Sequence, residues 1–112
     1  MPLGFATDAD LAEHFETHVI FQHEFQVVTK EEYLALADAF LSSPLDNNTH
    51  ECQRRNRDGT LGDKIRYNRV TQEFGILSVD NIIRSYYIPD PAKHGFITNY
   101  DYYTWNCNRR KG

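Results

Sequence analysis

Three short runs rich in isoleucine, tyrosine, phenylalanine and valine constrain the fold of this chain more than any other feature. They cover residues 63–68, 73–78 and 82–88, and only short polar links, 69–72 and 79–81, separate them. Runs of this length with tight links between them are typical of consecutive antiparallel strands. The sequence therefore predicts a three-stranded meander, and residues 51–55 offer a further strand before it.

The first half of the chain predicts two helices. Residues 8–22 carry apolar side chains at helical spacing, with Thr7 placed as the N-cap. Residues 30–42 follow a capping box, in which the Thr29 hydroxyl accepts from the Glu32 amide and the Glu32 carboxylate reaches back. Helices followed by an antiparallel sheet predict one α+β domain over residues 1–112, with the helices packed on one face of the sheet.

Charge is divided unevenly between the two halves of the chain. Residues 1–50 hold nine acidic residues and one basic residue, whereas residues 51–112 hold seven acidic and eleven basic residues. An anionic ligand is therefore expected to meet the second half. The candidate contacts there are Arg54, Arg55, Arg57, Arg109, Arg110 and Lys111. The alternative for residues 109–111 is a solvated tail.

Other sequence features narrow the class of protein. No apolar run approaches the ~18 residues of a membrane span, and the first residues lack the pattern of a secretory signal, so export would depend on sequence outside this chain. Cys52 and Cys107 are too few for a disulfide framework and show no zinc-binding spacing. We expect two free thiols, with a single bridge between the tail and the segment before the sheet as the alternative.

Arg84 is the first hint of function. Strict alternation along residues 82–88 places it on one strand face with Ile82, Tyr86 and Ile88, and places Ile83, Ser85 and Tyr87 on the other. A guanidinium among apolar neighbours is costly to bury without a partner or an anionic ligand. Arg84 is therefore either a phosphate-binding residue or the partner in a cross-strand ion pair.

The chain also carries an ordered series of short motifs. These are His14-Phe15-Glu16-Thr17-His18, Ile65-Arg66-Tyr67-Asn68, Glu73-Phe74-Gly75, Ile83-Arg84-Ser85-Tyr86-Tyr87, Pro89-Asp90-Pro91, His94-Gly95 and Thr98-Asn99-Tyr100-Asp101-Tyr102-Tyr103. With them the chain resembles the small toxin nucleases of the barnase, EndoU, colicin D and RelE-like group. Within that group it is similar to the C-terminal toxin domains of contact-dependent inhibition and polymorphic toxin systems.

This resemblance implies a fold and a function. The fold is a set of N-terminal helices on a four- or five-stranded antiparallel sheet, with the active site on the open sheet face. The implied function is that of a ribonuclease that needs no metal or cofactor and commonly cleaves tRNA. A cognate immunity protein would neutralise it, and it would otherwise be a monomer. It would be secreted or delivered as part of a larger effector and act in the cytoplasm of the target cell.

RNA cleavage needs only a few groups, because the 2'-hydroxyl is the nucleophile. It requires a proton carrier and a cation for the charge on the phosphate. His14 and His18 lie one helical turn apart, and either is a candidate proton carrier. Arg84 would bind the phosphate, with Ser85 or Tyr87 as hydrogen-bond donor, which requires a bulge or a strand end to bring the three together.

Further candidates follow from the same hypothesis. Asn99 would orient the catalytic groups, or residues 98–99 would merely end a strand. The candidate RNA contacts are Arg66, Tyr86, Thr98, Tyr102, Arg109 and Arg110. The tyrosines are equally explained as packing residues. A zinc site at His14 and His18 lacks a third ligand. The alternative function is a noncatalytic module that binds protein or RNA through the same sheet.

Overall fold

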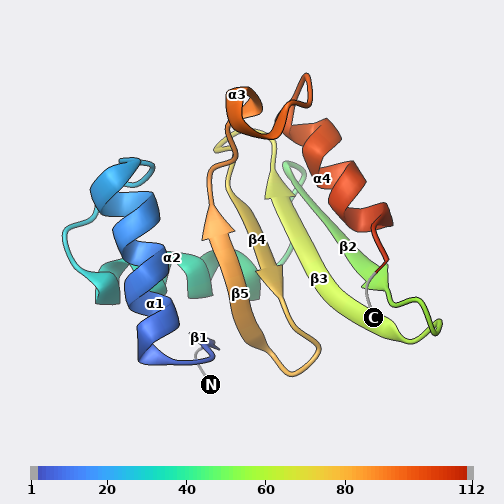
Figure 1. Cartoon of the computed structure of the whole chain (residues 1–112), viewed down its shortest axis with the longest axis horizontal. Helices are drawn as coiled ribbons and strands as arrows, with labels where there is room; N and C mark the ends of the chain where they lie inside the picture. Colours follow the sequence, from blue (N-terminus) through green and yellow to red (C-terminus); the bar gives the residue numbers. More distant parts are fainter. Residues whose placement is uncertain (1–2, 111–112) are drawn as a thin grey trace.

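The computed structural model describes residues 3–110 and contains a five-stranded sheet with helices on both faces (Figure 1). Lys111, one of the candidate cationic contacts, lies outside the described residues. The elements in chain order are β1 (Gly4–Phe5), α1 (Asp8–Phe15), a π-helical segment η1 (Glu16–Phe21), α2 (Lys30–Ser42), β2 (Thr49–Arg55), β3 (Leu61–Asn68), β4 (Phe74–Leu77), β5 (Ile82–Tyr87), α3 (Pro91–His94) and α4 (Asn99–Asn108). This confirms the predicted α+β class.

The sheet has the order β1-β5-β4-β3-β2. Strands β2 to β5 form the predicted antiparallel meander, whereas the two-residue strand β1 pairs with β5 in parallel. Both predicted N-caps are present: the Thr7 hydroxyl accepts from the Asp10 amide, and the Thr29 hydroxyl accepts from the Glu32 amide at 3.1 Å. The Glu32 carboxylate bonds the Thr29 hydroxyl and the Val28 amide, so the capping box closes one residue earlier than predicted.

Two hydrophobic cores lie on opposite faces of the sheet. Behind the sheet in the view of Figure 1, α2 packs together with α1 and η1 on a core that includes Tyr33, Ile83 and Tyr86, all almost completely buried. On the front face, α4 covers a second core that includes Ile65 and Tyr103. The N-terminal helices do share one core, but α4 occupies the other face of β2 and β3 and leaves only part of that face open.

The C-terminal helix α4 is held by an N-cap and by a disulfide. Its N-cap is Thr98, whose hydroxyl accepts from the Asp101 amide at 3.1 Å. A disulfide joins Cys107 of α4 to Cys52 of β2, so the expectation of two free thiols is wrong and the bridged alternative is correct. The pairing arises because α4 packs directly over β2, which brings two residues 55 positions apart together.

Strand β5 contains a β-bulge at Arg84. Ser85 pairs with Ile76 and Ile83 pairs with Leu77, so Arg84 has no partner on β4. Ile83 and Tyr86 consequently both face the core behind the sheet. Arg84 and Tyr87 turn to the front face, where they contact residues of β3 and α4. The predicted strict alternation is therefore wrong, and the bulge brings Arg84, Ser85 and Tyr87 to one side.

None of the helices within residues 3–110 is long and apolar enough to cross a lipid bilayer.

Candidate active site

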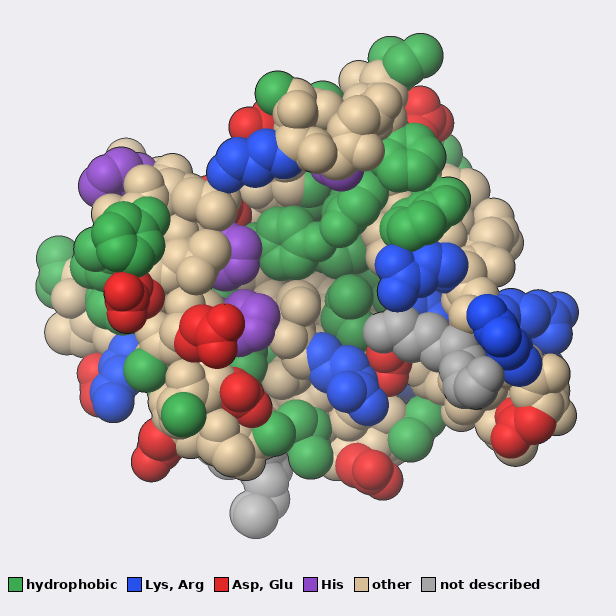
Figure 2. All heavy atoms as spheres, in the orientation of Figure 1, with side chains coloured by type: hydrophobic (Ala, Val, Ile, Leu, Met, Phe, Trp, Pro, Cys, Tyr) green, Lys and Arg blue, Asp and Glu red, His purple; other side chains and the backbone are tan. Residues whose placement is uncertain are grey.

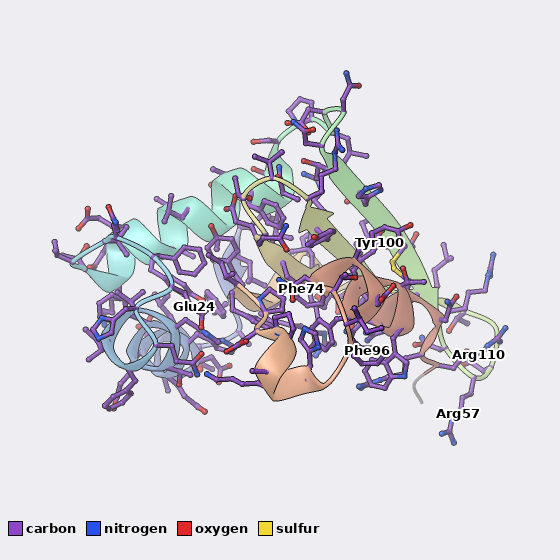
Figure 3. The ribbon with its side chains drawn as sticks, turned by 90° about the horizontal axis from the view of Figure 1, so that it is seen from above. Glu24, Arg57, Phe74, Phe96, Tyr100 and Arg110 are labelled. Carbon is purple, nitrogen blue, oxygen red and sulfur yellow. A yellow bond between two sulfur atoms is a disulfide. The ribbon has the colours of Figure 1, made fainter. Side chains whose placement is uncertain are left out.

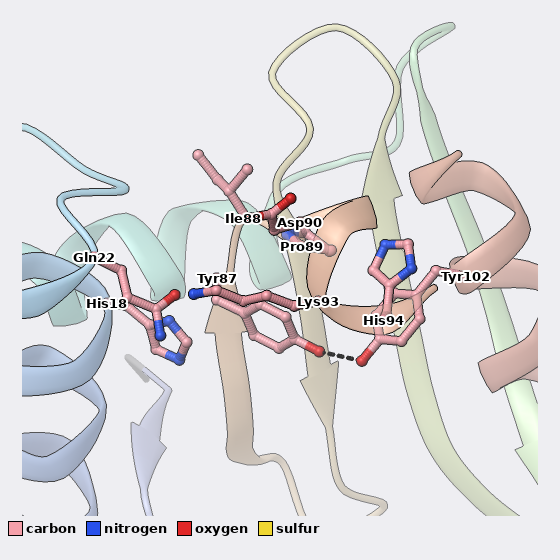
Figure 4. A pocket seen from close by; sticks show the side chains of 9 residues that line it. All are labelled: His18, Gln22, Tyr87, Ile88, Pro89, Asp90, Lys93, His94 and Tyr102. Carbon is pink, nitrogen blue, oxygen red and sulfur yellow. Dashed lines mark hydrogen bonds between the residues drawn. The ribbon is translucent and has the colours of Figure 1, made fainter. Parts of the chain in front are cut away.

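A hollow on the front of the sheet lies over β5, between η1 on one side and α3 with α4 on the other (Figures 1 and 2). Its main cavity has a volume of about 240 Å³. Figure 4 shows Tyr87 on the floor, His18 and Gln22 on one wall, and His94 and Tyr102 on the opposite wall. Ile88, Pro89, Asp90 and Lys93 complete the lining. The cavity thus joins two histidines, two tyrosines and a lysine from four separate elements.

His18 is held by a carboxylate that sequence reasoning did not identify. Its Nδ1 lies 2.7 Å from Oε2 of Glu24, and the two side chains are only 13% and 9% exposed. The other oxygen of Glu24 accepts from the Ile88 amide. Since an ionised carboxylate can only accept, His18 donates through Nδ1 and carries its free lone pair on Nε2. This is the arrangement that prepares an imidazole to take up a proton.

The position of His18 depends on local backbone structure. His18 lies in η1, and π-helical segments recur at functional sites in proteins. The chain then reverses at His23, which has a positive φ of 51° and brings Glu24 back beside η1. The His18 ring also stacks on Tyr87, with a centroid separation of 5.0 Å and an interplanar angle of 12°. The hydrogen bond to Glu24 and the stack on Tyr87 therefore hold the imidazole at the wall of the cavity.

His14 lies directly behind His18 in a stack of rings. Its ring centroid is 5.8 Å from that of His18 and 5.1 Å from that of Phe5. Its Nδ1 is buried and has no hydrogen-bond partner among residues 3–110. Burial lowers the pKa of His14, and the neighbouring His18 lowers it further. His14 is therefore neutral at physiological pH and adds no repulsion when His18 takes up a proton.

Arg84 lies on the front face at a second cavity, which it shares with His14, and it does not line the cavity of His18. This second cavity has a volume of about 200 Å³, and the side chain of Arg84 is 57% exposed. Its Nε donates to Oδ1 of Asp63 at 3.0 Å, while Oδ2 of the same carboxylate takes Nη1 of the buried Arg54 at 3.4 Å. Two guanidinium groups share one carboxylate, so a net positive charge remains. Within residues 3–110 the two Nη groups of Arg84 have no hydrogen bond, which leaves them for an anion.

Tyr87 on the floor of the cavity and Tyr102 on its wall meet through their hydroxyl groups. The hydroxyl of Tyr87 lies 2.6 Å from the hydroxyl of Tyr102 (Figure 4). Burial raises the pKa of Tyr87, and the hydrogen bond with Tyr102 raises it further, so the Tyr87 hydroxyl stays protonated at neutral pH. Tyr87 can donate a hydrogen bond to a ligand but cannot serve as a base. Lys93 extends from α3 across the cavity toward Gln22 and supplies a second cation, which sequence reasoning also missed.

His94 and Asn99 build the opposite wall. The Phe96 amide donates to Nδ1 of His94 at 3.1 Å, and Nε2 donates to Oδ1 of Asn99 at 2.9 Å. Both ring nitrogens are therefore occupied, and His94 acts as a packing residue that stacks on Tyr102 at 4.3 Å. Asn99 is buried and also donates to Gln72 and to the Pro89 carbonyl. Asn99 therefore holds the residues of the wall in place and does not line the cavity itself.

The remaining predicted contacts are distributed over the molecule. Arg66 lies on the back face, where it bonds Glu51 and two backbone carbonyls of α2 and the following residue. Tyr86 is fully buried in the same region, because the bulge turns it away from the front. Neither reaches the cavity. Thr98 serves as the α4 N-cap, and Arg109 and Arg110 lie at the far end of that helix.

Within residues 3–110, no group of three or more histidine, cysteine, aspartate or glutamate side chains is placed to hold a metal ion.

Comparisons with known proteins add one structural likeness. No family model and no curated protein matches the chain. A solved structure, described as a ribonuclease from Escherichia coli complexed with its inhibitor protein, is similar over 76% of this chain and 88% of that chain. The two sequences are 19% identical over the match, and the TM-score is 0.46.

Proposed function

We propose that this chain is an endoribonuclease that cleaves RNA by attack of the 2'-hydroxyl on the adjacent phosphate. The observation that carries the proposal is His18, which lines the cavity: its Nδ1 is held by the buried carboxylate of Glu24, while Nε2 has no hydrogen-bond partner among residues 3–110. In the reaction Nε2 takes the proton of the 2'-hydroxyl, and that oxygen forms a bond to phosphorus. The bond from phosphorus to the 5'-oxygen breaks, and the departing oxygen receives the proton held by His18 through a solvent water, which returns the imidazole to its neutral form.

Arg84 and Lys93 are the cations that would neutralise negative charge on the RNA during this reaction. The phosphorane carries additional negative charge, which the free Nη groups of Arg84 are suited to neutralise. Lys93 lines the main cavity, whereas Arg84 lines the second one beside His14, so Lys93 suits a neighbouring phosphate. Glu24 stabilises the positive charge that develops on His18. Because the substrate provides the nucleophile, the chemistry requires no metal ion.

The finer parts of the proposal rest on the resemblance of the sequence to toxin nucleases. They are that the RNA is tRNA, that the chain is an antibacterial toxin domain and that an immunity protein inhibits it. They also include delivery within a larger effector and action in the cytoplasm of a target cell. Ser85 lies next to Arg84 at the bulge of β5, and we propose its hydroxyl as a further hydrogen-bond donor to the phosphate.

Incubation of the purified chain with total tRNA in the presence of EDTA tests the proposal. Wild type should produce fragments with 2',3'-cyclic phosphate ends, and His18→Ala and Arg84→Ala should each reduce the rate by about 10²-fold or more. His23→Asn is the matched histidine control, because His23 is exposed and asparagine tolerates its left-handed backbone. Arg69→Ala, an exposed arginine outside the hollow, is the charge control.

The outcomes separate the ribonuclease from a noncatalytic module. Loss of cleavage in the His18 and Arg84 variants but not in the two controls supports the proposal. RNA that binds without being cut would favour the binding module instead. Cleavage by wild type that the His18 and Arg84 variants retain would show that another site, or a contaminant, performs the reaction.

A further inference from the structure

The exposed side of α4 carries an aromatic and cationic surface that the cavity does not use. Trp105 is 43% exposed and lies one turn beyond Tyr102, with ring centroids 6.5 Å apart. Phe96 packs against Trp105 at 5.6 Å. The guanidinium of Arg109 lies over the indole, 4.9 Å from its centroid. These residues continue outward from the cavity wall formed by Tyr102, so the surface and the cavity are contiguous.

Arginines gather where this surface ends. Arg55 and Arg110 line a hollow of about 220 Å³ beside the disulfide. Arg57 lies in the turn between β2 and β3, and Figure 3 shows Arg57 and Arg110 at the same end of the molecule, beyond Phe96. Among residues 3–110, none of Arg55, Arg57, Arg109 and Arg110 forms an ion pair. Asp58 in the same turn carries the opposing charge, with its carboxylate bonded to Thr60.

We propose that this surface, defined as Trp105, Arg109, Arg110, Arg55 and Arg57, binds a single-stranded RNA segment next to the cleaved phosphodiester. The inference rests on the proposed function and extends it, because it states how the substrate is held away from the scissile bond. Every nucleobase has a flat face that stacks on an aromatic ring or a guanidinium plane, while arginines bind the phosphates. An indole joined to unpaired arginines has both kinds of group.

The chemistry of the surface favours RNA over a protein partner. Its arginines have no carboxylate partner within the described chain, so a polyanion gains charge contacts along its whole length. Figure 3 shows Arg57 and Arg110 beyond Phe96, the residue that packs against Trp105, and Arg55 lines the same hollow as Arg110. A base stacked at Trp105 would leave the following phosphates over these arginines.

Trp105 is the only tryptophan in the chain, so it reports binding directly. The probe is a single-stranded 2'-O-methyl oligonucleotide, which has no free 2'-hydroxyl and cannot be cleaved by the proposed reaction. Titration into wild-type protein at low salt should quench the tryptophan fluorescence in a saturable manner. Arg109→Ala should weaken binding by about tenfold, and each arginine removed should reduce the slope of log affinity against log salt by about 0.7.

Two control variants make the result specific. Tyr100→Ala removes an aromatic ring of similar exposure, 47%, from the other side of α4, where it contacts His50 and Tyr67. Arg69→Ala removes an exposed arginine away from the surface. Both should bind the oligonucleotide as wild type does. Equal losses of affinity in Arg109→Ala and Arg69→Ala would overturn the proposal and indicate attraction by net charge alone.

Failure of this inference and failure of the proposed function are distinguishable. If wild type cuts RNA but the oligonucleotide leaves its fluorescence unchanged, the surface is not an RNA site and the enzyme proposal stands. The same result is expected if the surface binds a protein instead of RNA. If the oligonucleotide quenches fluorescence but no RNA is cut, the surface stands as an RNA site and the enzyme proposal falls.

Discussion

Replacement of Glu24 by glutamine tests the part of the site that gives His18 its role. Each carboxylate oxygen of Glu24 takes one donor, Oε2 from His18 and Oε1 from the Ile88 amide. Glutamine has nearly the same shape but only one acceptor oxygen, so one of the two donors must lose its partner. It also removes the negative charge beside the imidazolium that forms when His18 takes up a proton.

The expected loss follows from the bond that disappears. A hydrogen bond to a charged group contributes about 1.5–3 kcal/mol, which corresponds to about 10- to 150-fold in rate. We therefore expect Glu24→Gln to lower kcat by that factor and to leave KM nearly unchanged, because Glu24 is buried behind His18. The unfolding free energy in urea should fall by about 1–3 kcal/mol, since one buried donor is left without a partner.

The assay is cleavage of a short fluorescent RNA, measured in wild type, Glu24→Gln, His18→Ala and the double variant. If Glu24 acts through His18, Glu24→Gln costs nothing further once His18 has been replaced. Glu16→Gln is the control, because Glu16 is an exposed carboxylate in η1, the segment that contains His18. It should leave kcat unchanged. The reasoning is refuted if Glu24→Gln retains full kcat, or if it costs the same factor with and without His18.

Two further predictions concern stability. Because burial lowers the pKa of His14, the unfolded chain binds this proton at higher pH than the folded chain does, so stability falls as pH drops below about 6.5. His14→Phe should flatten urea midpoints between about pH 7 and pH 5, and an unchanged slope would show that His14 does not titrate in this way. Replacement of Cys52 and Cys107 by serine should lower the unfolding free energy by about 2–4 kcal/mol, also measured in urea, because the bridge closes a long loop. If wild type treated with reductant loses the same unfolding free energy as the serine variant, the disulfide between Cys52 and Cys107 is supported. If neither loses stability, the disulfide is contradicted.

Sequence reasoning succeeded where the signals are local. Thr7 and Thr29 mark helix starts because an N-cap needs only a side-chain oxygen and the next few amides. The strands of the meander follow from runs of β-branched and aromatic residues between polar turns. His14 and His18 share a helical face because of their spacing alone. These features depend on residues within one or two turns of each other.

The missed features depend on contacts between distant parts of the chain. Glu24 reaches His18 only because the backbone reverses at His23. Helix α4 is rich in aromatic residues that suit strands, and packing on the front core stabilises it as a helix. Asn99 resembled a site residue, yet its amide is used within the wall. Where a side chain ends up in such cases is decided by tertiary packing, which a single sequence does not specify.

The bulge at Arg84 lets β5 hold one additional front-facing side chain while Ile83 and Tyr86 both face the core. Upstream and downstream of it, β5 follows two patterns of alternation that are out of step by one position. Deleting Arg84 or Ser85 would restore one continuous alternation, in which Ile83 and Tyr86 still face the interior and Tyr87 still faces the front. A shortened β5 would therefore keep its core residues and lose one front-facing side chain, so the extra residue serves the front face and not the interior.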